Sequence, residues 1–127
     1  DLGRRDPGLM CDLATTLLFE GRTAEAEEAV AIALEAAPES GEALHLRASL
    51  RRQTADSNHV ADIEHRLEQA ITLPRSRAAA LYALAKERED IGDHAGAWDA
   101  LQQGAALKRS TLSGYDVASE IATIDAI

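Results

Sequence analysis

The chain of 127 residues has few of the residues that small proteins use to stabilise irregular folds. Its single cysteine, Cys11, excludes an internal disulfide and is consistent with a reducing compartment. No run approaches the ~18 consecutive apolar residues that a membrane-spanning helix needs. These shortages argue against a disulfide scaffold and a membrane span, and we expect a cytoplasmic protein.

Basic residues are also scarce, with 13 Lys and Arg against 22 Asp and Glu, for a formal net charge of −9. Nucleic acid and anionic lipid both repel such a surface unless the basic residues gather on one face. We therefore expect neither a nucleic-acid partner nor a membrane partner, and we interpret the acidic residues as a solvated outer surface.

Aromatic residues are few, with one Phe, two Tyr and one Trp, whereas alanine occurs 26 times. Alanine loses no side-chain entropy in a helix and lets two helix backbones approach closely. A chain rich in alanine and poor in aromatic and β-branched residues is typical of helix packed on helix. The sequence therefore predicts an all-α fold.

Two stretches of the chain repeat the same spacing without gaps. The first contains Leu13, Ala14, Leu17, Gly21, Ala26, Val30, Ala33 and Pro38. The second contains Leu84, Ala85, Arg88, Gly92, Ala97, Leu101, Gly104 and Arg109. From the glycine onward the steps are 5, 4, 3 and 5 in both. Such internal periodicity is typical of repeat proteins.

Each stretch predicts two helices that are joined by a short turn at the glycine. Gly21 and Gly92 would end the first helix in a left-handed conformation, which glycine adopts freely. Thr23 and Asp93 are suitable N-caps for the second helix. Pro38 cannot continue a helix and would end the first pair.

Small residues occur where the two helices of each pair would cross. Ala26 and Ala97 are expected to lie opposite Ala14 and Ala85, so that the helices pack closely. A buried stripe at helical spacing is predicted to continue from each crossing. Its residues are Val30, Ala33, Leu101 and Gly104.

A third, degraded copy lies between these two stretches. Its first helix is indicated by Ala43, Leu44, Leu46, Ala48 and Leu50. Its second helix is indicated by Ile63, Leu67, Ala70 and Pro74. The turn at 54–58 is about three residues longer than the turns of the other copies. The repeat period is close to the ~34 residues of tetratricopeptide repeats.

The chain is therefore divided into three helix pairs and a last helix. The expected domains are repeat 1 at 7–40, a degenerate repeat 2 at 41–75, repeat 3 at 76–110 and a C-terminal capping or linking helix at 114–127. The expected helices span about 8–20, 23–36, 41–53, 58–72, 76–90, 94–109 and 115–127. The break at 110–114 separates the last helix, whose apolar stripe is Val117, Ile121, Ile124 and Ile127.

The repeated pattern resembles the tetratricopeptide repeat family over roughly residues 7–110. The small residues at two crossing points, the glycine turn and the terminal proline carry this resemblance. Arg88 departs from it where an aromatic is common, Arg109 replaces the proline, and the middle copy lacks the glycine turn. The resemblance implies antiparallel helix pairs stacked as a right-handed superhelix, with the first helix of each pair lining the concave surface.

The run from Leu81 to Arg109 is also similar to the repeats that precede the catalytic domain in bacterial tetratricopeptide–sulfotransferase proteins. Ala85 and Ala105 depart from that pattern. The matching residues are Lys86, Glu89, Asp90, Gly92, Asp93, Ala97, Gly104, Leu107, Lys108 and Arg109. The resemblance implies a non-catalytic N-terminal part of such a protein, because no strand with a phosphosulfate-binding loop is present.

No group of residues in the chain has the spacing of a catalytic or metal site. None of the four histidines is paired at i, i+4 with another His or Cys, and one cysteine does not support an ordinary zinc site. No nucleophile is placed on a turn with backbone N–H groups for an oxyanion. We expect no enzymatic activity, no cofactor and no metal.

Binding of a protein or peptide partner is the expected function. The resemblance places it on the concave face, at first-helix positions outside the core stripe. These candidate residues are Cys11, Thr15, Leu18, Phe19, His45, Ser49, Arg52, Gln53, Tyr82, Lys86, Glu89 and Asp90. Relatives that clamp a peptide carboxylate use Lys, Asn and Arg where this chain has Cys11, Thr15 and His45, so no carboxylate clamp is expected.

Three hypotheses about function follow. The chain is an interaction module attached to a bacterial sulfotransferase, a stand-alone adaptor or assembly factor, or a homodimerisation element that acts through the stripe of the last helix.

Overall fold

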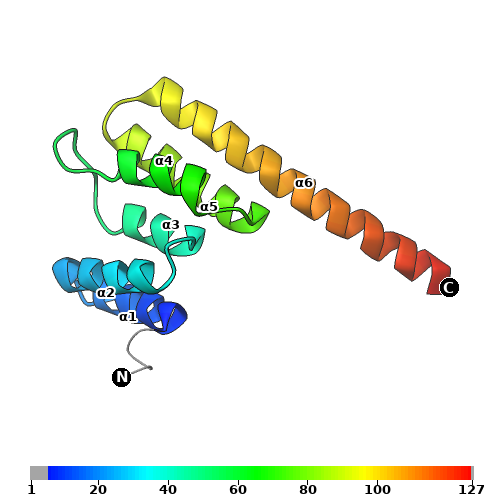
Figure 1. Ribbon diagram of the computed structural model, residues 1–127, viewed down its shortest axis with the longest axis horizontal. Coiled ribbons are helices and arrows are strands. Elements are labelled where there is room, and N and C mark those ends of the chain that lie inside the picture. The colour runs from blue at the N-terminus through cyan, green and yellow to red at the C-terminus, as the bar shows by residue number, and fades with distance from the viewer. Residues whose placement is uncertain (1–5, 127) are drawn as a thin grey trace.

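A computed structural model describes the backbone of residues 6–126 and the side chains of residues 6–110. The fold of the described residues is all-α, as predicted, because six helices and no strand occur in this range. The helices form a layered stack from α1 to α6, and the C-terminal part of α6 extends beyond the others (Figure 1). They are α1 (Pro7–Phe19), α2 (Thr23–Ala36), α3 (Gly41–Ser49), α4 (Val60–Gln69), α5 (Pro74–Asp90) and α6 (His94–Ala126).

The last helix differs from its prediction. α6 runs without interruption from His94 to Ala126, so the expected break at 110–114 and a separate final helix are wrong. A single internal glycine costs a helix only about 1 kcal/mol, and the segment contains no proline that would stop it. The side chains of the predicted stripe at 117–127 lie outside the described residues.

Both predicted glycine turns are present. Gly21 has φ 80° and Gly92 has φ 88°, and these are the glycines with positive φ in the described chain. The amide of Arg22 donates to the carbonyl of Leu17 at 2.8 Å, and the amide of Asp93 donates to the carbonyl of Arg88 at 2.8 Å. These bonds satisfy carbonyls at the ends of α1 and α5, so the same local chemistry turns the chain in both copies.

One of the two predicted N-caps is confirmed. Asp93 Oδ1 accepts a hydrogen bond from the amide of Gly96 at 3.0 Å at the start of α6. Thr23 is instead the first residue of α2, and Arg22 occupies the cap position without a side-chain cap bond. The Arg22 guanidinium pairs with the carboxylate of Glu25 in the first turn, where negative charge is favourable.

The alanines at the predicted crossing points are buried. Ala14 and Ala26 are fully buried between α1 and α2, and Ala85 and Ala97 are buried between α5 and α6. Val30, Ala33 and Gly104 of the predicted stripe are buried as well. Leu101 is 41% exposed, so its assignment to the buried stripe is wrong. No described residue covers the side of α6 that carries Leu101, which therefore remains open to solvent.

Replacing Ala97 with leucine should lower the free energy of unfolding by about 1–3 kcal/mol, because a larger side chain at this crossing forces α6 away from α5. Thermal unfolding followed by circular dichroism measures the effect. Ala95 is an exposed neighbour on the same helix, so Ala95→Leu is the matched control. Equal unfolding temperatures for the two variants would contradict the crossing-point assignment.

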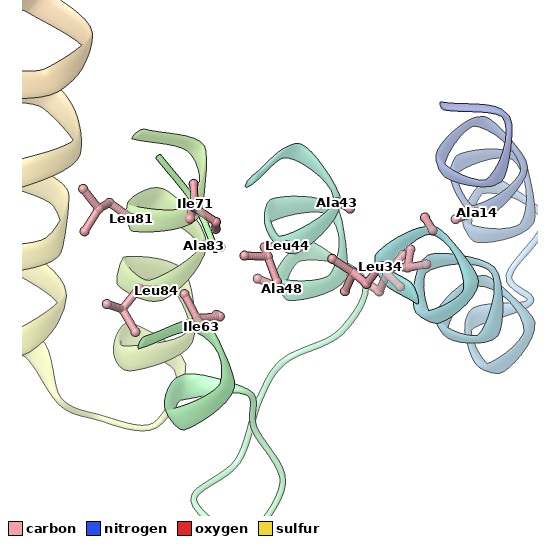
Figure 2. Packing of buried hydrophobic residues seen from close by; sticks show 14 of the residues in the cluster. Ala14, Leu34, Ala43, Leu44, Ala48, Ile63, Ile71, Leu81, Ala83 and Leu84 are labelled. Atoms are coloured by element: carbon pink, nitrogen blue, oxygen red, sulfur yellow. The ribbon is translucent and has the colours of Figure 1, made fainter. Parts of the chain in front are cut away.

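The middle of the stack is built differently from its two ends. α1 packs closely along α2, and α5 packs closely along α6, as expected of helix pairs. α3 packs mainly on α5, and α4 also lies against α5, whereas comparable packing between α3 and α4 is not seen among the described residues. In Figure 2, α3 lies between α2 and α5, with Leu44 on its α5 side and Ala43 on its α2 side. α5 is therefore the central helix of the second half.

The N-terminal turns of α3 and α5 approach at backbone distance. A Cβ atom added to Gly41 would lie 1.9 Å from the carbonyl oxygen of Ser76 and 2.7 Å from its carbonyl carbon. Ser40 caps α3 at the same place, where its hydroxyl accepts a bond from the amide of Ala43 at 3.2 Å. The absence of a side chain at Gly41 lets α3 rest directly on α5.

A buried carboxylate connects α4 to α5. Glu87 is fully buried, and its side chain accepts hydrogen bonds from the backbone amide of His59 at 2.5 Å and pairs with His59 Nδ1 at 2.8 Å. His59 stands at the N-cap of α4 and makes no side-chain cap bond of its own. Glu87 thus supplies the acceptor at the start of α4 and fixes that end of the helix on α5.

Candidate functional site

A groove of about 430 Å³ lies between α3, α5 and α6, near the predicted binding face. Its residues come from three helices that the α3–α5 and α5–α6 packing holds together. They are His45, Tyr82, Ala85, Lys86, Glu89, His94, Ala97, Trp98 and Leu101. Apolar surface predominates in the groove, and polar groups lie at one end, which is a common composition for a binding pocket.

Four of the twelve predicted residues line this groove. His45 contributes from α3, and Tyr82, Lys86 and Glu89 contribute from successive turns of α5. Ser49 and Arg52 are exposed nearby but do not line it. The groove therefore brings together one first-helix position of the second copy and three of the third.

Lys86 and Asp90 connect α5 to the loop after α3. Lys86 Nζ donates to the carbonyl of Arg51 at 2.8 Å and pairs with the Asp90 carboxylate. Asp90 also accepts a bond from the backbone amide of Gln53 at 3.0 Å. Burial alone would raise the pKa of Asp90, but the Gln53 amide and the Lys86 ammonium outweigh it and hold that pKa below its usual value. These groups therefore hold the loop in place.

Gln53 is not available to a partner. Its side chain is 1% exposed, and its amide nitrogen donates to the carbonyl of Arg51 at 3.1 Å. The expectation that it lies on the accessible face is wrong, because α3 ends at Ser49 and not at 53. Beyond that end, Gln53 turns inward to meet Asp90.

One end of the groove carries an exposed ion pair. Glu89 and His94 interact at 2.9 Å across the turn between α5 and α6, and both side chains are more than half exposed. The Glu89 carboxylate raises the pKa of His94, first by accepting a hydrogen bond from the imidazole and second by its negative charge. A partner can therefore meet a carboxylate and a titratable imidazole at this end.

The four predicted residues of α1 do not reach the groove. Cys11, Thr15 and Leu18 are half-buried on α1, and Phe19 is 86% exposed at its end. Burial, followed by the charges of Asp12 and Glu42, raises the pKa of the Cys11 thiol and makes it a weaker nucleophile. The expectation of one lining that spans all three copies is not met, because the groove begins at α3.

Sequence reasoning missed the wall that α6 contributes. His94, Trp98 and Leu101 line the groove, and the Trp98 side chain is 61% exposed. The predicted binding residues all lie on the first helix of each pair, whereas α6 is the second helix of its pair. The signal was present, because Trp98 is the one tryptophan in a chain with few aromatic residues.

A second hollow of about 260 Å³ adjoins the first at Tyr82 and opens toward the start of α5. It carries Arg75, Lys108 and Glu42 around an apolar floor of Ala78 and Ala79. The two hollows together follow α5 from its N-terminal turn to Glu89. The concave strip thus has two basic side chains at one end and the Glu89–His94 pair at the other.

Comparison with known proteins gave no match to a family model, a curated protein or a solved structure. Within residues 6–126, no helix combines the length and the apolar character that crossing a membrane requires. The assignment of function therefore depends on the geometry of the groove and on the sequence pattern.

Proposed function

We propose that the chain is a protein-interaction module whose groove between α3, α5 and α6 binds a segment of a partner protein. The observation that carries this proposal is the exposed Trp98 beside Tyr82 and Leu101 in a groove of about 430 Å³. Aromatic side chains in a concave surface are typical binding hot spots, because each buries a large area at a low entropic cost.

The chemistry of the groove indicates which segment it accepts. An aliphatic or aromatic side chain of the partner would fill the space between Trp98, Leu101 and Tyr82. Lys86 is already paired with Asp90, whereas Glu89 is more than half exposed at the rim. The whole chain carries a net charge of −9. A neutral or basic segment with an apolar anchor therefore fits best.

A peptide library displayed on phage and selected on the immobilised chain tests this proposal. Binding of the selected peptides is measured by calorimetry and by the emission of Trp98, the one tryptophan. Tyr82→Ala and His45→Lys should each weaken binding by about tenfold or more, because the first removes an aromatic wall of the groove and the second places a cation beside a neutral or basic segment. Circular dichroism of each variant checks that the loss of binding is not caused by unfolding.

Phe19→Ala is the matched control, because Phe19 is an exposed aromatic residue outside the groove. It should leave the affinity unchanged. Selected peptides that bind the Tyr82 and His45 variants as tightly as the original chain would reject the groove as the binding site.

The tetratricopeptide superhelix and the attachment to a bacterial sulfotransferase belong to the same proposal. Their support is the repeated spacing around Gly21 and Gly92, with its buried alanines, and the similarity of the run 81–109 to the repeats of such proteins. The groove would then hold a substrate protein or a second subunit beside the catalytic domain. The coding sequence after Ile127 tests this: a strand followed by a phosphate-binding loop supports the attachment, and its absence favours a stand-alone adaptor.

A further inference from the structure

A second surface lies on the side of α6 that faces away from α5. Gly104 and Ala100 are buried on the α5 side of α6, where a Cβ atom on Gly104 would lie 3.3 Å from the carbonyl oxygen of Ala78. Along the exposed side of α6, six residues form a strip of about 470 Å³, which we call the α6 strip. Two of the six also form the α6 wall of the groove. They are Trp98, Leu101, Gln102, Ala105, Ala106 and Arg109.

The composition of the α6 strip differs from that of the chain as a whole. The chain has 22 acidic residues, yet the strip contains none, and its one charged side chain is that of Arg109. The large apolar side chains, Trp98 and Leu101, lie at one end, and the small Ala105 and Ala106 lie toward the other. An exposed tryptophan and leucine beside alanines, without acidic residues among them, indicate a surface that becomes covered.

We propose that the α6 strip pairs with the α6 strip of a second copy in an antiparallel, two-fold symmetric dimer. With the two-fold axis between residues 103 and 104, helical spacing sets Leu101 opposite Ala106 of the second copy and Gln102 opposite Ala105. Leu101 and Gln102 then each meet an alanine, which lets the two helices pack closely. The gradient of size along the strip makes the surface complementary to itself in this direction.

In the same register, the charged side chains of the two copies are complementary. Trp98 comes opposite Arg109 of the second copy, and a guanidinium over an indole ring is a favourable cation–π contact. Asp99 flanks Trp98 and is exposed, so its carboxylate lies within reach of the same arginine. Symmetry repeats both contacts, so each end of the dimer carries one basic and one acidic group. A parallel arrangement would instead set Arg109 against Arg109.

The direction of α6 favours a second copy over a following segment of the same chain. The helix continues for 17 residues from Arg109 to Ala126. At 1.5 Å per residue this carries the chain about 25 Å past the strip. Figure 1 shows this part of α6 leading away from the other helices. A second copy can reach the strip directly by the two-fold operation.

Sedimentation velocity of the full chain over a range of concentrations tests the proposal. The original chain should form dimers, and Ala105→Glu and Arg109→Asp should each raise the dimer dissociation constant by about tenfold or more. Ala31→Glu is the matched control, because it adds the same charge to an exposed alanine of α2 and should leave the dimer intact. A chain that stays monomeric up to about 1 mM would overturn the proposal.

A charge exchange tests the register. Asp99→Arg should weaken the dimer because two cations would then meet, and the double variant Asp99→Arg with Arg109→Asp should restore it. A double variant as weak as the single ones would reject the antiparallel register. The inference goes beyond the groove function. Trp98 and Leu101 belong to both surfaces, but Asp99, Ala105 and Arg109 lie outside the groove, and His45 and Tyr82 lie outside the strip. Variants of these unshared residues therefore let the two proposals fail separately.

Discussion

Replacing Gly41 with alanine is expected to destabilise the protein by about 3 kcal/mol or more, the upper end of the effects of overpacking. The added Cβ would lie 1.9 Å from the carbonyl oxygen of Ser76 and 3.0 Å from its Cα. Both atoms belong to the backbone of α5, which cannot rotate away as a side chain can. α3 must therefore move off α5, and the packing around Leu44 and Ala48 is lost with it. Urea unfolding followed by circular dichroism measures the change.

Gly104→Ala provides a graded control, because it introduces the same methyl group at another close helix contact. There the new Cβ would lie 3.2 Å from the Tyr82 ring and 3.3 Å from the Leu81 Cβ, so small shifts of side chains can accommodate it. The gain in helix propensity of about 1 kcal/mol offsets this crowding. We expect a net change within about 1 kcal/mol, and similar losses for the two variants would show that α3 and α5 do not meet at Gly41.

Replacing Glu87 with alanine is expected to lower the free energy of unfolding by about 3 kcal/mol. The substitution leaves the His59 amide without its buried acceptor and opens a cavity beside α4. Because Glu87 holds the first turn of α4, amide hydrogen exchange should accelerate most in Val60–Gln69. Chemical unfolding gives the energy, and exchange measured by mass spectrometry gives the location.

Glu89→Ala is the matched control for Glu87→Ala. It removes a carboxylate two residues further along α5 that also pairs with a histidine. That pair is more than half exposed, and surface pairs contribute about 0–1 kcal/mol. If the loss at Glu87 were no greater than the loss at Glu89, the buried pair with His59 would not fix α4. An equal acceleration of amide hydrogen exchange in all helices of the Glu87 variant would also contradict the assignment, because Glu87 would then not stabilise α4 in particular.

The local features of the two outer helix pairs could be predicted from the sequence, because short-range chemistry determines them. Gly21 and Gly92 turn the chain in the left-handed conformation, and Ala26 and Ala97 are buried where the helices cross. The packing in the middle could not be predicted. Whether α4 rests on α3 or on α5 depends on contacts such as that of Glu87 with His59, which lie 28 residues apart and carry no periodic signal.

The candidate site was predicted in part for the same reason. His45, Tyr82, Lys86 and Glu89 follow from helical periodicity, whereas Trp98 and Leu101 belong to the groove because no described helix covers that side of α6. A sequence shows which residues share a face, but not which face remains without a neighbour. Gln53 was misplaced because its amide is drawn to Asp90, and that bond interrupts the helical spacing used to place it.

The contact between α3 and α5 at Gly41 has a consequence for ligand size. α3 touches α5 most tightly at its first residue, while His45 stands one turn further along and forms one wall of the groove. Beyond Gly41, α3 packs along α5 through the buried Leu44 and Ala48, so the backbone contact at Gly41 helps to set how close His45 lies to Tyr82. The width of the opening for an incoming side chain thus depends on a residue that does not line the groove.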